Sequence, residues 1–289
     1  MAESKLSRLL LESPLARVYD VVCRTPRSGY GALMVNAVPQ ICLPRRGVYL
    51  IERRGQTTVV DTNTALMLGP DDEYRVAHPT GDGDEGTVLA LRPDLAEDAI
   101  GRVEGRVGNL RPRDHLAVRV VDRALRNPGP DQLEAEDATL LLLGLLSRAF
   151  ADTGNDDRTL GPGQRLRIER ARALLASAPT DRWDLGALGR ALRCSPFHLA
   201  RQFRAATGET ISRYTLRLRL AVALERLAKG EHDIAALAVE TGFSHHSHFT
   251  ARFRSVFGIT PSKAREILTR RKIEELRAVL AGLELADCR

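Results

Sequence analysis

Three histidines near the C-terminal end of the chain have the residue type and the spacing of metal ligands. His245 and His248 are three residues apart, so they would share one face of a helix, and His246 lies between them. A zinc site usually needs further donors, and this segment offers no cysteine or aspartate at a useful spacing. The sequence therefore favours packing or groove-facing roles for these histidines over a metal site.

The four cysteines, Cys23, Cys42, Cys194 and Cys288, could carry redox chemistry. They are far apart and form no CxxC pair, which predicts reduced thiols in the cytoplasm and no disulfide scaffold. Two alternatives stay open: a redox pair of Cys23 and Cys42, and a reactive Cys194, for which a small buried filler is the simpler role.

Residue sets typical of enzymes are missing from the sequence. It has no Ser/His/Asp set, no phosphate-binding loop and no dinucleotide fingerprint. We therefore expect neither enzyme activity nor a cofactor. Five side chains of the N-terminal half could line a pocket for a small polar or anionic ligand, with surface and core packing as the alternative: Tyr49, Arg53, Tyr74, Arg75 and His78.

A short pattern in the C-terminal half occurs twice, fifty residues apart. Phe-Arg-x-x-x-Gly-x-Thr-x-Ser, followed by a basic residue, begins at Phe203 and again at Phe253. An internal repeat indicates one supersecondary unit used twice, and two copies are too few for a solenoid. The repeat therefore predicts a paired binding device.

Each copy has the pattern of a helix, a tight turn and a second helix. Ser195 is a natural N-cap in the first copy, and Ser244 takes that place in the second, after the turn glycine Gly242. This is the helix-turn-helix pattern, predicted at about residues 184–206 and 233–257. The helix predicted between them, 211–228, would be about 27 Å long at about 1.5 Å per residue. That is close to the roughly 34 Å between successive major-groove faces of DNA.

Charge is divided unevenly along the chain. Residues 164–289 hold 23 Lys and Arg against 13 Asp and Glu, whereas residues 1–163 hold 20 against 24. The basic half suggests a polyanionic partner, since local charge governs such association.

The N-terminal half has the pattern of a small barrel or sandwich. Short β-branched runs separated by turns extend from Val18 to about Arg92. Residues 4–12 are predicted as a short helix or arm. Residues 114–125 and 131–150 are predicted as helices, which would form either a dimer seam or a layer on their own barrel.

The segment from Leu185 to Arg265 resembles the DNA-binding domain of the AraC/XylS family of transcription regulators. The likeness is carried by the motifs within 195–208, by Arg219-Leu220-x-x-Ala223, and by the motifs within 234–249 and 253–261. It implies that both second helices enter the major groove. The positions that match the family's base-facing residues are Pro196, Phe197, Ala200, Arg201, His246, Ser247, Thr250 and Ala251.

Two departures from the family pattern bear on DNA recognition. Ala251 stands where many relatives have an arginine that matches Arg201, and Arg193 stands where the second unit has Gly242. The first unit should therefore carry more of the direct readout. Arg201 is expected to make a bidentate contact to guanine, with a phosphate contact as the alternative.

Many members of this family place a cupin-like barrel ahead of the DNA-binding domain, and residues 46–55 and 64–79 resemble its strands. The resemblance implies an α+β multidomain fold: a cupin-like β-barrel with helices (1–152), a linker (153–163), and an all-α domain with two helix-turn-helix motifs (164–289). Metal-binding cupins need clustered histidines and a carboxylate. This half has only His78 and His115, so no metal is expected.

Taken together, these patterns predict a cytoplasmic transcription regulator, without signal peptide or membrane partner. It would bind double-stranded promoter or operator DNA and act with RNA polymerase, as an activator under the control of a small-molecule effector. The alternative is an N-terminal domain that only forms a homodimer or binds a protein partner.

Overall fold

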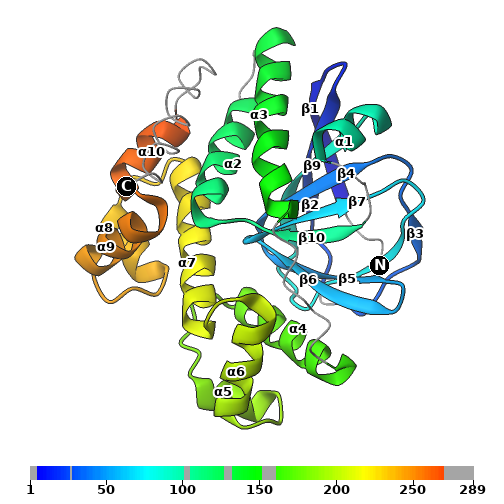
Figure 1. Ribbon diagram of the computed structural model, residues 1–289. Helices are drawn as coiled ribbons and strands as arrows, with labels where there is room; N and C mark the ends of the chain where they lie inside the picture. Colours follow the sequence, from blue (N-terminus) through cyan, green and yellow to red (C-terminus); the bar gives the residue numbers. More distant parts are fainter. Residues whose placement is uncertain (1–4, 27, 101–104, 127–131, 152–160, 270–289) are drawn as a thin grey trace.

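The computed structural model describes residues 5–26, 28–100, 105–126, 132–151 and 161–269. The fold has the predicted α+β class: strands dominate the N-terminal half, and the C-terminal half is helical (Figure 1). Most of the predicted linker, 153–163, lies outside the described residues.

Two antiparallel sheets make up the N-terminal half. The strands are β1 (Lys5–Glu12), β2 (Ala16–Cys23), β3 (Met34–Val35), β4 (Gln40–Arg46), β5 (Val48–Arg53), β6 (Gln56–Asp61), β7 (Thr64–Leu68), β8 (Glu73–Ala77), β9 (Asp84–Leu91) and β10 (Arg106–Asn109). One sheet has the order β1-β2-β9-β4-β7-β10 and the other β3-β8-β5-β6. The sheets face each other as separate ladders, so the predicted barrel is an open two-sheet sandwich.

The prediction for residues 4–12 was wrong. Lys5–Glu12 form strand β1, which pairs antiparallel with β2 from Lys5 opposite Cys23 to Glu12 opposite Arg17. The Ser13 hydroxyl accepts hydrogen bonds from two backbone amides of the turn, which fixes the hairpin. The leucine spacing fits a helix too, but pairing with β2 satisfies the backbone here and overrides that local preference.

Three helices follow the strands: α1 (Pro93–Ile100), α2 (Pro112–Leu125) and α3 (Gln132–Ala151). Leu116 and Val120 of α2 and Leu142 of α3 share one apolar cluster with Val18 and Leu89 of the six-stranded sheet. The helix pair therefore packs on its own sheets, which was one of the two predicted arrangements.

The C-terminal half contains both predicted helix-turn-helix units. Its helices are α4 (Pro162–Ser177), α5 (Leu185–Ala191), α6 (Pro196–Thr207), α7 (Ile211–Ala228), α8 (Ile234–Glu240), α9 (His246–Phe257) and α10 (Pro261–Thr269). The units α5–α6 and α8–α9 lie at opposite ends of α7, which has the predicted bounds (Figure 1). Among the described helices, none has both the length and the apolar character that a bilayer crossing needs.

The caps of the two second helices differ. Ser195 caps α6 as predicted, and its hydroxyl accepts from the His198 amide at 3.3 Å. The predicted cap Ser244 was wrong: His245 is the N-cap of α9, and its Nδ1 accepts from the His248 amide at 3.2 Å. The side chain of histidine can replace a hydroxyl because its unprotonated ring nitrogen is an acceptor.

Arg193 occupies the left-handed backbone conformation that the second unit gives to a glycine. Its φ is +53°, and that of Gly242 is +84°. This conformation costs a residue with a Cβ about 1–2 kcal/mol, whereas glycine has an entropic cost of about 0.5–1 kcal/mol.

We therefore expect Arg193→Gly to raise the free energy of unfolding by about 0.5–1 kcal/mol, measured by urea denaturation. Arg190→Gly, inside α5, is the matched control and should lower it by about 1 kcal/mol. A destabilised Arg193→Gly variant would show that the positive φ costs nothing here.

The apolar core continues across the predicted domain boundary. The cluster that holds Leu116 and Leu142 also contains Leu220 and Leu224 of α7 and Phe253 of α9. A second cluster joins Val48 and Val59 of the four-stranded sheet to the first helix-turn-helix unit. Both units are therefore anchored on the N-terminal half through their apolar sides.

Candidate nucleic-acid interface

Helix α6 turns one side to its own core and the other to solvent. Leu199 and Phe203 are fully buried. The predicted base-facing residues lie on the other side: Pro196, Phe197 and Arg201 are exposed and Ala200 is half-buried. Phe197 is 85% exposed, and it is the largest apolar side chain on this side of α6.

Helix α9 has the same division. The rings of Phe249, Phe253 and Phe257 stack edge to face along its buried side, with centroids 5.6 and 4.7 Å apart. Its predicted base-facing residues lie away from that stack: His246, Ser247 and Ala251 are exposed and Thr250 is half-buried. The packing of the two domains thus leaves both of these faces open.

The arginines on the open sides of α6 and α9 differ in whether they already have a hydrogen-bond partner. Within the described part of the chain, Arg201 has no acidic partner and no hydrogen bond, so its guanidinium is available to a ligand. On α9, Arg252 donates from Nε to Nε2 of His248 at 3.4 Å. The residue that matches Arg201 is the small Ala251, so α9 lacks an arginine at that position.

Exposed basic side chains surround both second helices and α7. They are Arg190, Arg193, Arg204, Arg213, Arg252, Arg254 and Lys263. Such a border fits phosphate contacts, which position a protein on DNA without reading its sequence.

Two of the three histidines of the second unit have local structural roles. His245 caps α9, and the ring of His248 meets that of Phe243 edge to face, with centroids 5.7 Å apart. His246 is one of the predicted base-facing residues, and that role stays a prediction.

A buried cluster of charges fastens α7 to the N-terminal half. Glu225 of α7 is 7% exposed, accepts a hydrogen bond from Arg119 of α2, and lies 3.6 Å from the Arg45 guanidinium of β4. Arg119 also pairs with Asp122, 2.7 Å away on α2. Burial opposes ionisation of Asp122, but Arg119 and two further arginines outweigh it and lower its pKa to about 2. The Asp122 carboxylate therefore stays charged at neutral pH and holds the arginines in place.

A second buried contact joins the start of α7 to the four-stranded sheet. The Tyr214 hydroxyl donates to Asp61 at the end of β6. Arg172 of α4 donates to the Val59 carbonyl at 3.2 Å, and its guanidinium lies 3.6 Å from Asp61. Burial raises the pKa of Tyr214 well above its ordinary value, so the phenol remains a neutral donor. Both ends of α7 are thus bound to the N-terminal half.

His115 lies in the contact between α2 and α9, where its ring meets Phe257 with centroids 6.5 Å apart. Burial, with Arg119 and Arg217 nearby, lowers its pKa to about 3. The unfolded chain would bind a proton at an ordinary pKa of about 6.5, so it holds more protons than the folded state between those values.

The free energy of unfolding should therefore fall as pH drops below about 6.5, by about 1–2 kcal/mol between pH 7 and pH 5 from this residue. In His115→Phe, which retains an aromatic ring, that contribution should vanish. Urea denaturation of both proteins at the two pH values measures it; equal losses in the two proteins would contradict it.

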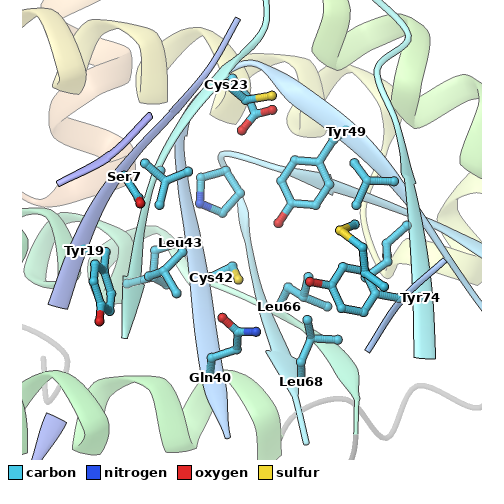
Figure 2. A pocket seen from close by; sticks show the side chains of 18 of the residues that line it. Ser7, Tyr19, Cys23, Gln40, Cys42, Leu43, Tyr49, Leu66, Leu68 and Tyr74 are labelled. Carbon is cyan, nitrogen blue, oxygen red and sulfur yellow. The ribbon is translucent and has the colours of Figure 1, made fainter. Parts of the chain in front are cut away.

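A cavity of about 370 Å³ lies between the two sheets. Tyr49 and Tyr74 point into it, as Figure 2 shows, and Gln40, Cys42 and Leu68 line its walls. Among the described lining residues there is no arginine or lysine. The lining suits a compact, mainly apolar molecule with a few groups that can bond to phenols and amides.

Three of the five predicted ligand residues meet in this cavity: Tyr49, Tyr74 and His78. The other two do not line it. Arg53 pairs with Asp72 at 3.1 Å, and Arg75 is exposed. Arg75 lies apart because it follows Tyr74 directly, and successive side chains of a strand point to opposite faces. Arg53 has the parity of Tyr49 but lies at the end of β5, where it pairs with Asp72.

Strand alternation could have identified further lining residues. Tyr19, Val21 and Cys23 share one face of β2, and Asp84 lies across from Cys23 on β9. No disulfide joins the cysteines of the described residues, Cys23, Cys42 and Cys194. Counting histidines alone gave no sign that a thiol and a carboxylate would lie beside His78.

The C-terminal half is similar in sequence to known proteins. The helix-turn-helix domain family matches residues 188–267. The HTH-type transcriptional activator RhaS of Pectobacterium atrosepticum is 28% identical over 142 residues, which are 48% of this chain and 49% of that protein. The uncharacterized HTH-type transcriptional regulator YidL of Escherichia coli is 32% identical over 99 residues, 34% of this chain and 33% of that protein. The chain thus spans about half or less of the length of these curated relatives.

Among solved structures, ToxT of Vibrio cholerae is similar over 91% of this chain and 100% of that one, with 15% identity and a TM-score of 0.40. The matched segment contains both helix-turn-helix units and the α7 that joins them, and the two-sheet domain precedes it. Within residues 188–267 the chain is thus similar to the helix-turn-helix domain family, and curated relatives that match this half are named as transcriptional regulators.

Proposed function

We propose that this chain is a sequence-specific DNA-binding transcription regulator that reads two successive major grooves on one face of a duplex. The observation that supports this most is the pair of capped helices, α6 and α9, with open faces at opposite ends of the 18-residue α7. A helix of that length spans about 27 Å, close to the pitch of B-DNA. Curated relatives named as transcriptional regulators support the same function.

Base contacts are assigned to the open faces of the two helices. In this proposal α6 reads with Pro196, Phe197, Ala200 and Arg201, and α9 with His246, Ser247, Thr250 and Ala251. Arg201 has the reach and the free guanidinium for a bidentate contact to guanine, and Phe197 offers an apolar surface for a thymine methyl. The two helices carry different side chains at matching positions, so the two half-sites should be unlike.

Selection from a pool of random duplexes by the full chain tests this function. We expect enrichment of a site with two unlike half-sites about one helical turn apart, and the half-site read by α6 should be the more stringent. Recovery of no common sequence at physiological salt would contradict specific recognition, since charge alone retains DNA without selecting it.

Small-molecule control is the second part of the proposal. The cavity between the sheets would hold the effector, and a bonded route leads from its wall to α7. Thr87 of β9 donates to Asp122, which pairs with Arg119, which bonds Glu225 on α7. A ligand that shifts β9 would alter these contacts in turn, from Thr87 to Glu225. The position of α7 would then change, and with it the positions of α6 and α9.

Thermal unfolding against a panel of metabolites tests that control, because a ligand that binds only the folded state stabilises it by mass action. Compact, mainly apolar compounds should raise the melting temperature, and Leu68→Trp, which fills the cavity, should abolish the increase. A rise that persists in the filled variant would place the ligand elsewhere.

Activation is the mode that the named activator RhaS suggests for this chain, and we propose that the chain acts with RNA polymerase. A dimerising role of the N-terminal half is the second candidate, and one observation favours it. Leu133 and Leu140 are one heptad apart on α3 and are 71% and 48% exposed. Sedimentation velocity tests the dimerising role. A dimer that Leu140→Glu dissociates supports this role, and a monomer at all concentrations contradicts it.

A further inference from the structure

Three side chains that can bind metal converge at one end of the cavity. Cys23 ends β2, His78 follows β8, and Asp84 begins β9, where it lies opposite Cys23 in the strand register. Figure 2 shows Cys23 at the end of the cavity away from Gln40 and Leu68. The thiol, the imidazole and the carboxylate come from three different strands or strand ends, so the fold itself assembles the group.

Two of the three separations between the donor atoms are close to those that a single small ion requires. Cys23 Sγ lies 3.5 Å from His78 Nε2, and Nε2 lies 2.9 Å from Asp84 Oδ1. All three donors lie within 4.8 Å of one another. Zinc bonds of about 2.3 Å to sulfur and about 2.0–2.1 Å to nitrogen give a sulfur–nitrogen separation of about 3.5 Å in a tetrahedron. The nitrogen–oxygen pair would open by only a few tenths of an ångström.

Hydrogen bonding alone explains the cluster less well. A neutral imidazole nitrogen carries either one proton or one lone pair, yet the same Nε2 of His78 faces both the thiol and the carboxylate. The imidazole is also deeply buried, with 7% of the side chain exposed. A cation shared by all three donors satisfies them together.

The hydrogen-bond partners of Cys23 and His78 determine how tightly the three side chains should bind a metal ion. The Thr25 hydroxyl lies 2.9 Å from Cys23 Sγ, where it can donate to a thiolate. Nδ1 of His78 has no hydrogen-bond partner among the described residues. Since such a partner is worth about 10–100-fold in metal affinity, we expect a site weaker than a structural zinc site.

We propose that Cys23, His78 and Asp84 form a site for zinc or a similar late first-row divalent cation, with an open coordination position facing the cavity. One sulfur, one nitrogen and one oxygen donor suit such ions and not calcium or magnesium, which take oxygen ligands. The bound ion would be the strongest cationic group of the cavity, which otherwise has no lysine or arginine in its described lining. This site stands independently of DNA binding and is tested with metal alone.

Cobalt(II) titration of the reduced, chelator-stripped full chain tests the proposal. We expect one equivalent to bind and to give both visible d–d bands and a near-ultraviolet band from thiolate-to-cobalt charge transfer. Zinc should displace it. Cys23→Ser should lose the charge-transfer band, and His78→Gln and Asp84→Asn should each weaken binding by about 100-fold or more. Circular dichroism of each variant reports whether it is folded.

Two variants are matched controls. Cys42→Ser removes another cavity thiol, and His248→Gln removes a histidine of the exposed pair on α9; both should retain the charge-transfer band and the affinity. Binding without a thiolate band, or binding unchanged in Cys23→Ser and His78→Gln, would overturn the site. Cys23→Ser, which alters a single atom of a half-buried side chain, keeps the test decisive if His78→Gln does not fold.

Discussion

Glu225→Ala is expected to lower the free energy of unfolding by about 3 kcal/mol, because it removes the buried carboxylate that links Arg119 and Arg45 to α7, although Asp122 and Asp20 still partly neutralise them. Arg119 and Arg45 lie against Glu225 and are 6–7% exposed in their side chains. Neither can reach water without parting α7 from α2 and β4. Urea denaturation measures the loss, and hydrogen exchange should rise first in α2 and α7, where the two halves meet.

Glu240→Ala is the matched control for that prediction. Glu240 also pairs with an arginine, Arg226, but their side chains are 55% and 33% exposed. An exposed pair contributes about 0–1 kcal/mol, so this variant should stay close to the unaltered protein. Equal effects of the two substitutions would show that the buried cluster does not hold the domains together. If the cluster couples the cavity to α7, Glu225→Ala should also abolish any effect of a cavity ligand on DNA affinity.

Arg201→Ala should reduce discrimination between the selected site and a site altered at one guanine by about 1–3 kcal/mol. The alanine side chain cannot reach the base edge, whereas the basic residues around it still hold phosphate. Non-specific affinity should therefore change little. Competition gel shifts at fixed salt measure both quantities.

Arg190→Ala serves as the control because its side chain is exposed at the end of α5, outside the predicted base-facing set. It should weaken specific and non-specific binding alike and lower the salt dependence by about one phosphate contact. If Arg201→Ala also weakens specific and non-specific binding alike, Arg201 contacts a phosphate. Base recognition by α6 must then rest on its other exposed side chains.

Much of the helical half could be predicted from local sequence. The apolar spacing between Ile211 and Ala228 gives a helix with those bounds, and the repeat places two helix-turn-helix units around it. Local signals suffice because the apolar residues of these helices recur at helical spacing, and because residues such as Ser195 and Thr210 cap the helices locally.

Features that depend on distant residues were not predictable in this way. The leucines of Lys5–Glu12 fit a helix until β2 offers a pairing partner. Cys23, His78 and Asp84 are brought together only by the strand register, and the burial of Glu225 depends on α2 packing against α7. Propensity and periodicity carry no information on such contacts, which tertiary structure decides.

Hydroxyl-radical footprinting of the full chain on its selected duplex tests the proposed function most directly. We predict two protected segments on one face of the DNA, about 34 Å apart along the axis, with different base sequences in the two grooves. In parallel methylation protection with dimethyl sulfate, Arg201→Ala should expose guanine N7 only in the groove that α6 reads. A single protected segment, or two segments that Arg201→Ala alters equally, would contradict the reading of two unlike half-sites by α6 and α9.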